Sequence, residues 1–320
     1  MIVRWGLPEL PGILGDLAIA RPLLVASERW TNANLGVQPA ARWTEIPSDR
    51  IAEAVAHAGD GVLAVGGGSA IDLAKAISAG AAIPVVSVPT TYAGAEWTPY
   101  FGVRDPDRKL TGGGAGAHLG GVVYEPELTL SLARAETVGT ALNALAHCAE
   151  ALYVEGHNPT ADEHALHGAR LIGEWLPRVA DDLQDLEART NLLKGAMHAG
   201  MALGASMLGL GHAMAQALGG RYGLQHGAMN ALCLPVALRF NAEVAPDAFS
   251  RFAAALGAGD PVASVQELAR LGGFERLRDF GIPERDLGAV AEATVERAGA
   301  KANPRPASAV EVEELLRSIW

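Results

Sequence analysis

The chain has 320 residues, of which 49% are hydrophobic and 19% charged, so it is long enough for two domains and too apolar for wholesale disorder. Its formal net charge is −11 at pH 7, and its pI is near 5.3. Such a field repels nucleic acid and anionic membranes, so we expect neither as a partner, and an anionic substrate would need a local cluster of cations.

The ends of the chain and its cysteines favour a cytoplasmic protein. The first ten residues, MIVRWGLPEL, contain no basic segment followed by an apolar core, so no signal peptide is predicted. No stretch approaches the ~18 uninterrupted apolar residues of a membrane span. The two cysteines, Cys148 and Cys233, stand in apolar surroundings and are expected to be buried, reduced thiols.

The first part of the chain alternates between strand and helix patterns. Short apolar runs at 21–27, 61–65 and 84–88 are typical of buried parallel strands. Helical periodicity separates them at 51–58 and 70–79. This alternation predicts an α/β layer with a parallel sheet, whose ligands bind at the carboxyl ends of its strands.

After about residue 127 the chain becomes rich in Ala, Leu and Glu, and no convincing series of strands remains. A Gly-rich and then turn-forming stretch at 112–126 is interpreted as the boundary between an α/β nucleotide-binding domain, 1–127, and an all-helical catalytic domain, 128–320. The predicted helices are 136–154, 161–174, 185–208, 212–218, 228–241, 246–256, 262–271, 287–298 and 310–319.

Two turns in the first domain suit a nucleotide. The predicted strand 61–65 runs into a glycine turn, 66–69, and then into a helix, an arrangement that lets bare backbone approach a pyrophosphate. Ser69 also suits the N-cap of an ordinary tight turn. Residues 89–96 follow the third strand and bring the hydroxyls of Thr90 and Thr91 to the same sheet edge, where they suit a ribose or phosphate, or a simple Ser/Thr turn. Together the two turns predict nucleotide binding.

A second group of polar residues lies in the helical domain. Asn143 and His147 are four apart and share one helix face. His212 and His226 lie in a Gly-rich region that can fold over that face. Three imidazoles and a polar residue suggest a metal site, but the residue that would supply negative charge is an amide.

The motifs at 66–75 and 88–99 resemble those of the iron-dependent (group III) alcohol dehydrogenase superfamily, most of all its maleylacetate reductase branch. Further similar stretches are 108–111, 124–130, 143–153 and 303–306, so the resemblance covers nearly the whole chain. It implies the dehydroquinate synthase-like fold, a nucleotide-binding α/β domain followed by a helical domain. It also implies hydride transfer from NADH or NADPH, and a homodimer.

The resemblance also implies which residues bind the cofactor and the substrate. A serine at the end of the first strand tolerates a 2′-phosphate and Arg29 can pair with it, whereas Glu28 favours NADH, so use of both nucleotides is expected. We predict that Tyr92, Arg108 and Arg305 bind the substrate. The two arginines are also compatible with ordinary solvated surface positions. The predicted cofactor contacts are Ser27, Gly67, Gly68, Ser69, Thr90, Thr91, Ala93 and Lys109.

In metal-dependent members the ligands correspond to positions 143, 147, 212 and 226, and the first of these is an Asp. Here Asn143 removes the one anionic ligand, and an amide oxygen is a much weaker donor to a divalent ion. We therefore expect no bound metal. Gln216 and Gln225 depart from the reductase branch, which has His and Pro there, so the substrate itself is left open.

The leading hypothesis is a metal-independent NAD(P)H-dependent reductase of a small oxo-acid or unsaturated dicarboxylate. Its catalytic residues would be Asn143, His147, His212 and His226; either of the last two would donate the proton while Asn143 and His147 orient the carbonyl. Alternatives are a divalent-metal (Fe or Zn) alcohol or aldehyde dehydrogenase, a dehydroquinate synthase-like lyase or cyclase, and a non-catalytic nucleotide-binding protein.

Overall fold

The computed structural model describes residues 1–31 and 33–320, which form two compact units. One unit comprises Met1–Thr91 and Ala95–Ser131, and the other Tyr92–Gly94 and Leu132–Trp320. The main division falls at Ser131/Leu132, where the sequence predicts 127/128. Within the described ranges, no helix is long and apolar enough to cross a membrane.

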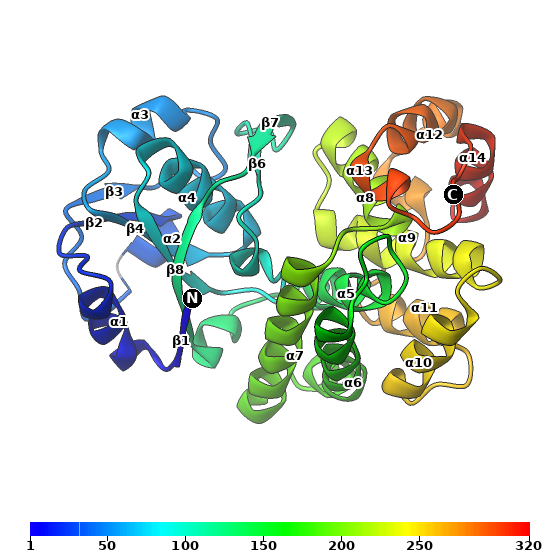
Figure 1. Ribbon diagram of the computed structural model, residues 1–320, viewed down its shortest axis with the longest axis horizontal. Helices are drawn as coiled ribbons and strands as arrows, with labels where there is room; N and C mark the ends of the chain where they lie inside the picture. The colour runs from blue at the N-terminus through cyan, green and yellow to red at the C-terminus, as the bar shows by residue number, and fades with distance from the viewer. Residues whose placement is uncertain (32) are drawn as a thin grey trace. The chain divides into compact units, whose positions relative to one another are not determined.

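The first unit is built on a six-stranded parallel sheet, drawn in blue to cyan-green in Figure 1. Its order is β1-β8-β5-β4-β2-β3. Strands β2 and β4 are buried along their whole length, as expected of a parallel sheet covered on both faces. The strands are β1 (Ile2–Trp5), β2 (Pro22–Ala26), β3 (Ala41–Trp43), β4 (Gly61–Gly66), β5 (Pro84–Pro89) and β8 (His118–Tyr124).

Helices cover both faces of this sheet. Helix α1 (Leu10–Asp16) packs on one face through Leu10, Ile13 and Leu14. Helices α3 (Ile51–Ala56) and α4 (Gly68–Ala81) pack on the other. A four-residue helix, α2 (Glu28–Thr31), follows β2. The α/β layer, its three predicted strands and its two predicted helices are confirmed.

The strand order reverses between β2 and β4. From β2 the chain moves outward to β3, then returns to place β4 on the other side of β2. In open parallel sheets, ligands bind outside the carboxyl ends of the strands at such a switch point. The loops that follow β2, β4 and β5 therefore lie where a ligand is expected.

The interpretation of residues 112–126 as a turn-forming boundary is wrong. Residues His118–Tyr124 form β8, an internal strand paired with both β1 and β5. A Cβ at Gly121 would lie 2.3 Å from Ile13 Cδ1, so the close approach of α1 requires glycine at this position. In the sequence alone, the same glycine indicates a turn. Before it, β6 (Phe101–Arg104) and β7 (Leu110–Gly114) form an antiparallel hairpin.

The second unit is all-helical, as predicted, and its central helix is α5, which packs against α6, α7 and α9. Helix α6 continues beyond the predicted end at 174, through Pro177, and the predicted helix 287–298 divides into two. The helices are α5 (Arg134–Ala151), α6 (Pro159–Asp181), α7 (Leu186–Ala205), α8 (Leu210–Tyr222), α9 (His226–Asn241), α10 (Pro246–Leu256), α11 (Pro261–Leu271), α12 (Leu287–Val295), α13 (Ala298–Lys301) and α14 (Ala309–Ser318).

Candidate functional site

In the first unit, the loops after β4 and β5 are packed together. The backbone N–H of Thr90 donates to the carbonyl of Gly66 at 3.0 Å. A Cβ on Gly67 would lie 2.8 Å from Thr91 Cγ2, so the approach of these two loops requires glycine there. Ser27 follows directly on the neighbouring strand β2, at the same edge of the sheet.

Helix α4 begins within this group of loops. Its N-cap is Gly67, which offers no side-chain cap, so Ser69 lies in the first turn and is not the N-cap. The first amides of a helix have no intrahelical partner, and they carry the positive end of the helix dipole. The amides of Gly68 and Ser69 therefore fit the pyrophosphate of a dinucleotide.

Two predicted cofactor and substrate residues belong instead to the second unit. The carbonyl of Ala93 accepts a hydrogen bond from Asn143 Nδ2 at 3.0 Å. The Tyr92 side chain is fully buried, and its hydroxyl accepts from Arg189 Nη1 at 3.1 Å. Both residues therefore take part in the packing of the helical unit around α5.

The predicted cations have local partners or surroundings of their own. Arg108 and Lys109 are exposed in the turn of the β6–β7 hairpin, where the Lys109 N–H donates to Asp105 Oδ1 at 2.8 Å. Arg305 pairs with Glu311 at 2.6 Å, and its Cζ lies 4.1 Å above the ring of Phe240. Phe240 is about 21 Å along α9 from His226, at a rise of ~1.5 Å per residue. Arg305 is therefore remote from the imidazoles.

The second unit brings the three predicted imidazoles together. His147 comes from α5, His212 from α8 and His226 from the first position of α9. The rings of His147 and His212 are stacked, with centroids 4.4 Å apart and an interplanar angle of 13°. The His212 and His226 centroids are 5.7 Å apart at 48°.

Two carboxamides hold the outer rings of this cluster. Asn143 Nδ2 donates to Ala93 O and also lies 3.1 Å from His147 Nε2, while Asn143 Oδ1 accepts from Asn230 Nδ2 at 2.7 Å. Asn230 Nδ2 lies 3.0 Å from His226 Nε2. Because an amide nitrogen only donates, both Nε2 atoms are acceptors in these contacts.

A buried carboxylate holds the middle ring. Glu150 is fully buried in α5, and its Oε2 lies 2.6 Å from His212 Nδ1. Neither Glu150 nor Asn230 was predicted from the sequence. The available signal was their spacing, since Glu150 is three residues after His147, and Asn230 four after His226, on the same helix faces.

Burial keeps one of the rings neutral. The pKa of His147 lies well below its usual value, chiefly because the imidazole is removed from water, and further because His212 and His226 would add like charge. His147 is therefore uncharged at neutral pH. It can orient a partner but is not the imidazolium that a general acid requires.

The donor set does not fit a divalent cation in this arrangement. Within the described part of the chain, no group of three or more His, Cys, Asp or Glu side chains has metal-binding geometry. The Asn143 oxygen already accepts from Asn230, and Nδ1 of His212 faces Glu150. The rings of His147 and His212 are nearly parallel, so they would have to turn before their nitrogen lone pairs could meet at one tetrahedral centre.

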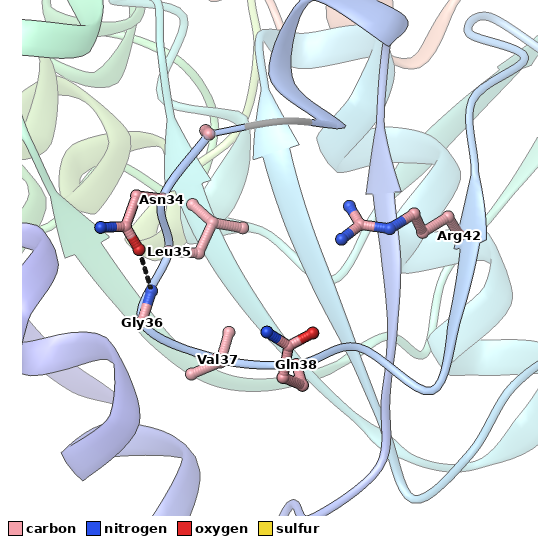
Figure 2. A pocket seen from close by; sticks show the side chains of 7 residues that line it. Asn34, Leu35, Gly36, Val37, Gln38 and Arg42 are labelled. Carbon is pink, nitrogen blue, oxygen red and sulfur yellow. Dashed lines mark hydrogen bonds between the residues drawn. The ribbon is translucent and has the colours of Figure 1, made fainter.

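A separate pocket lies in the first unit, in the loop before β3 (Figure 2). Its lining includes Asn34, Gln38 and Arg42, and Asn34 Oδ1 accepts from the Gly36 N–H at 3.3 Å. None of the predicted site residues lines this pocket, and we assign it no function.

The sequence matches two family descriptions. Residues 10–116 match "Iron-containing alcohol dehydrogenase", and residues 137–320 match "Fe-containing alcohol dehydrogenase family, C-terminal". The chain therefore belongs to the iron-containing alcohol dehydrogenase family, and it is an oxidoreductase of that family.

Within the family, the chain is similar to maleylacetate reductases. It is 37% identical to the enzyme of Burkholderia cepacia over 277 residues, which are 86% of this chain and 78% of the relative. The crystal structure of maleylacetate reductase from Agrobacterium tumefaciens superposes with a TM-score of 0.88 at 30% identity, covering 100% of this chain and 95% of that one.

A more distant structure shares the fold. Sulfoacetaldehyde reductase from Bifidobacterium kashiwanohense, solved in complex with NAD+, has a TM-score of 0.87 at 20% identity and covers 100% of this chain and 96% of its own. Homologues in the family use NAD(P).

Proposed function

We propose that this protein is an NAD(P)H-dependent reductase of a small oxo-acid or unsaturated dicarboxylate, and that it works without a divalent metal. The observation that carries the proposal is the hydrogen bonding of Asn143. Both hydrogens of its amide nitrogen are directed to protein acceptors, which fixes the orientation of the amide, and its oxygen already accepts from Asn230. The position therefore offers a cation one neutral, already engaged oxygen in place of a carboxylate. The similarity to maleylacetate reductases supports the substrate class.

When bound, reduced nicotinamide supplies the hydride. As the hydride adds to an electrophilic carbon, negative charge develops on the substrate's carbonyl oxygen and must be neutralised. In place of a Lewis acid, this chain offers the imidazole cluster, in which a protonated ring can deliver H⁺ to that oxygen. His147, kept neutral by burial, is suited to orienting the substrate rather than to donating.

The proposal includes use of both nucleotides. Arg29 donates to the carbonyl of Ser131 at 3.0 Å and lies over the Trp30 ring, so a 2′-phosphate would have to compete for a guanidinium that is already engaged. We therefore expect NADPH to be accepted without a large advantage over NADH. The ratio of kcat/KM for the two nucleotides, measured at fixed ionic strength, tests this.

The assembly is also part of the proposal. Relying on the similarity of the chain to its family, we propose a homodimer. Light scattering coupled to gel filtration tests it directly, and a mass equal to one 33.1 kDa chain would contradict it.

The activity is tested with a panel of substrates, and turnover is measured as the loss of the absorbance of reduced nicotinamide at 340 nm. The panel compares 4-oxo-2-enedioates, saturated 2-oxo acids and neutral aldehydes, each with chelator-treated enzyme and with added Zn²⁺ or Fe²⁺. We expect dicarboxylates to be preferred and turnover to survive chelation. Stoichiometric metal in the active enzyme, with activity lost on its removal, would favour a metal-dependent alcohol dehydrogenase instead.

A further inference from the structure

We propose that Glu150 is a positioning residue that holds His212 with its proton on Nδ1, which makes Nε2 of His212 the atom that exchanges a proton with the substrate. The inference deepens the proposed function and rests on it for the chemical step. Its structural part, the state of the His212 ring, can be measured independently of any activity.

The carboxylate of Glu150 faces three hydrogen-bond donors. Its Oε2 accepts from the Gly209 N–H at 2.7 Å and lies 2.6 Å from His212 Nδ1, and its Oε1 accepts from the His212 N–H at 3.1 Å. Gly209 is the N-cap of α8, so the carboxylate also faces the positive end of that helix. Three donors converge on a carboxylate that only accepts, and Nδ1 must therefore be the donor of the 2.6 Å bond.

Two glycines at the start of α8 make room for this carboxylate. A Cβ on Gly209 would lie 2.9 Å from Glu150 Cδ, and a Cβ on Gly211 would lie 2.9 Å from Glu150 Oε1. Side chains at either position would push the carboxylate away from His212. The arrangement is therefore specified by α8 as well as by α5.

The three rings differ in which nitrogen has a hydrogen-bond partner. Nε2 of His147 and Nε2 of His226 each accept from a carboxamide. Nε2 of His212 is buried and has no hydrogen-bond partner among the residues that the structure describes. Of the three rings, His212 is thus the one with an anchored Nδ1 and an open Nε2, the arrangement that a carboxylate produces when it orients an acid–base histidine.

The chemical step needs only reduced nicotinamide and His212. The electrophilic carbon would gain hydride from the nicotinamide, whose C–H bond breaks as it is oxidised, and an electron pair moves onto the carbonyl oxygen. The Nε2–H bond of protonated His212 breaks as the O–H bond of the product forms. His212 is left neutral, with Nδ1–H still directed to Glu150, and water restores the proton.

The experiment combines a spectroscopic readout with steady-state kinetics. Proton–nitrogen correlation spectra of protein carrying ¹⁵N-labelled histidine report which ring nitrogen is protonated, and His212→Ala identifies the signal. In the wild type we expect protonated Nδ1 and unprotonated Nε2 for neutral His212. The opposite assignment would overturn the proposal whether or not any substrate has been found.

Glu150→Gln tests the role itself. An amide nitrogen at the Oε2 position would face Nδ1–H, and at the Oε1 position it would face the His212 N–H, so either orientation weakens the hold on the ring. Both orientations also remove the negative charge that stabilises protonated His212. We expect kcat to fall ~10²-fold or more, in line with the usual contribution of general acid–base catalysis, while KM changes only a few-fold. The exposed Glu292→Gln on α12 is the matched control and should leave kcat unchanged.

A conservative variant separates positioning from folding. Glu150→Asp keeps the carboxylate but shortens its reach, so it should retain the Nδ1–H signature in part and recover part of kcat. If Glu150→Gln fails to fold, the wild-type spectrum and Glu150→Asp still decide the matter. Wild-type kcat and an unchanged His212 signature in a folded Glu150→Gln would refute the proposal. Absence of reductase activity with the expected signature would refute the proposed function alone.

Discussion

Asn143 and His147, four residues apart on α5, are joined by a contact of 3.1 Å between the amide Nδ2 and the imidazole Nε2. Since the amide can only donate, the imidazole nitrogen is held as an acceptor. An aspartate at the same place would be an acceptor facing an acceptor, and a shared cation would then resolve the conflict. The difference between one amide and one carboxylate therefore decides which chemistry the cluster supports.

Asn143→Asp is expected to create affinity for a divalent ion and to lower stability in its absence. The new carboxylate faces the carbonyl of Ala93 without a proton to share, and such an unsatisfied buried group costs ~1–3 kcal/mol or more. Calorimetric titration with Zn²⁺ and thermal unfolding with and without Zn²⁺ measure both effects. Asn191→Asp, where the amide donates within α7 to Glu187, is the control, and equal zinc binding by the two variants would contradict the prediction.

Gly67→Ala is expected to weaken nucleotide binding by crowding Thr91. The added Cβ would lie 2.8 Å from Thr91 Cγ2, and overpacking of this kind costs ~1–3 kcal/mol. We expect a roughly tenfold higher dissociation constant for NADH, which corresponds to about 1.4 kcal/mol. Fluorescence titration with NADH measures it.

Two further variants check the cause of that effect. Thr91→Ser removes the obstructing methyl group, so the double variant with Gly67→Ala should recover most of the lost affinity. Gly12→Ala in α1 has open space around its Cβ and should leave nucleotide binding unchanged. No recovery in the double variant would mean that the crowding argument is wrong.

His198 is expected to make stability depend on pH. Burial lowers its pKa to about 4, with further lowering from the charges of His167, His164 and Arg170. Between this value and the unfolded value near 6.5, the unfolded chain binds more protons, so stability is full above pH ~6.5 and declines as the pH falls toward 4. Urea unfolding at pH 4.5 to 7.5 should show a shallower decline for His198→Gln. The same slope in both proteins would contradict the assignment.

Glu96 is expected to act in the opposite direction. It is buried in the first unit, where desolvation raises its pKa, and Tyr124 donates to its Oε1 at 2.8 Å. The folded state therefore keeps a proton that the unfolded chain has lost above pH ~4.5, and stability declines as the pH rises through the folded pKa. Glu96→Gln removes this decline, so its melting temperature should exceed that of the wild type at pH 8 and approach it near pH 4.5. An unchanged difference across that range would count against this explanation.

Local patterns were sufficient where a segment's environment is visible in its own residues. Strands β2, β4 and β5 are short apolar runs, and most helices of the second unit have an unbroken helical periodicity of apolar residues. These three strands and these helices were therefore predicted. Strand β8 was missed because Gly121 serves the packing of Ile13, which is more than a hundred residues away in the sequence. No local pattern contains that information.

The candidate site shows the same limit. Family spacing sufficed to name the three imidazoles, and the structure brings them together. Glu150 was missed because its spacing from His147 shows only that the two share a helix face, whereas the donors that define its role come from α8. Arg305 was expected near the substrate because it lies in a matching motif. The motif contains no information on where along α9 the side chain packs, and it packs against Phe240, far from His226.

The three residues Tyr92–Gly94 have a consequence for how the protein can be divided. They precede Leu132 but belong to the helical unit, where they supply the carbonyl that anchors Asn143 and the hydroxyl that meets Arg189. A fragment starting at Leu132 would expose both donors to an emptied space, so the helical half cannot be cut out as a self-sufficient module at the apparent border.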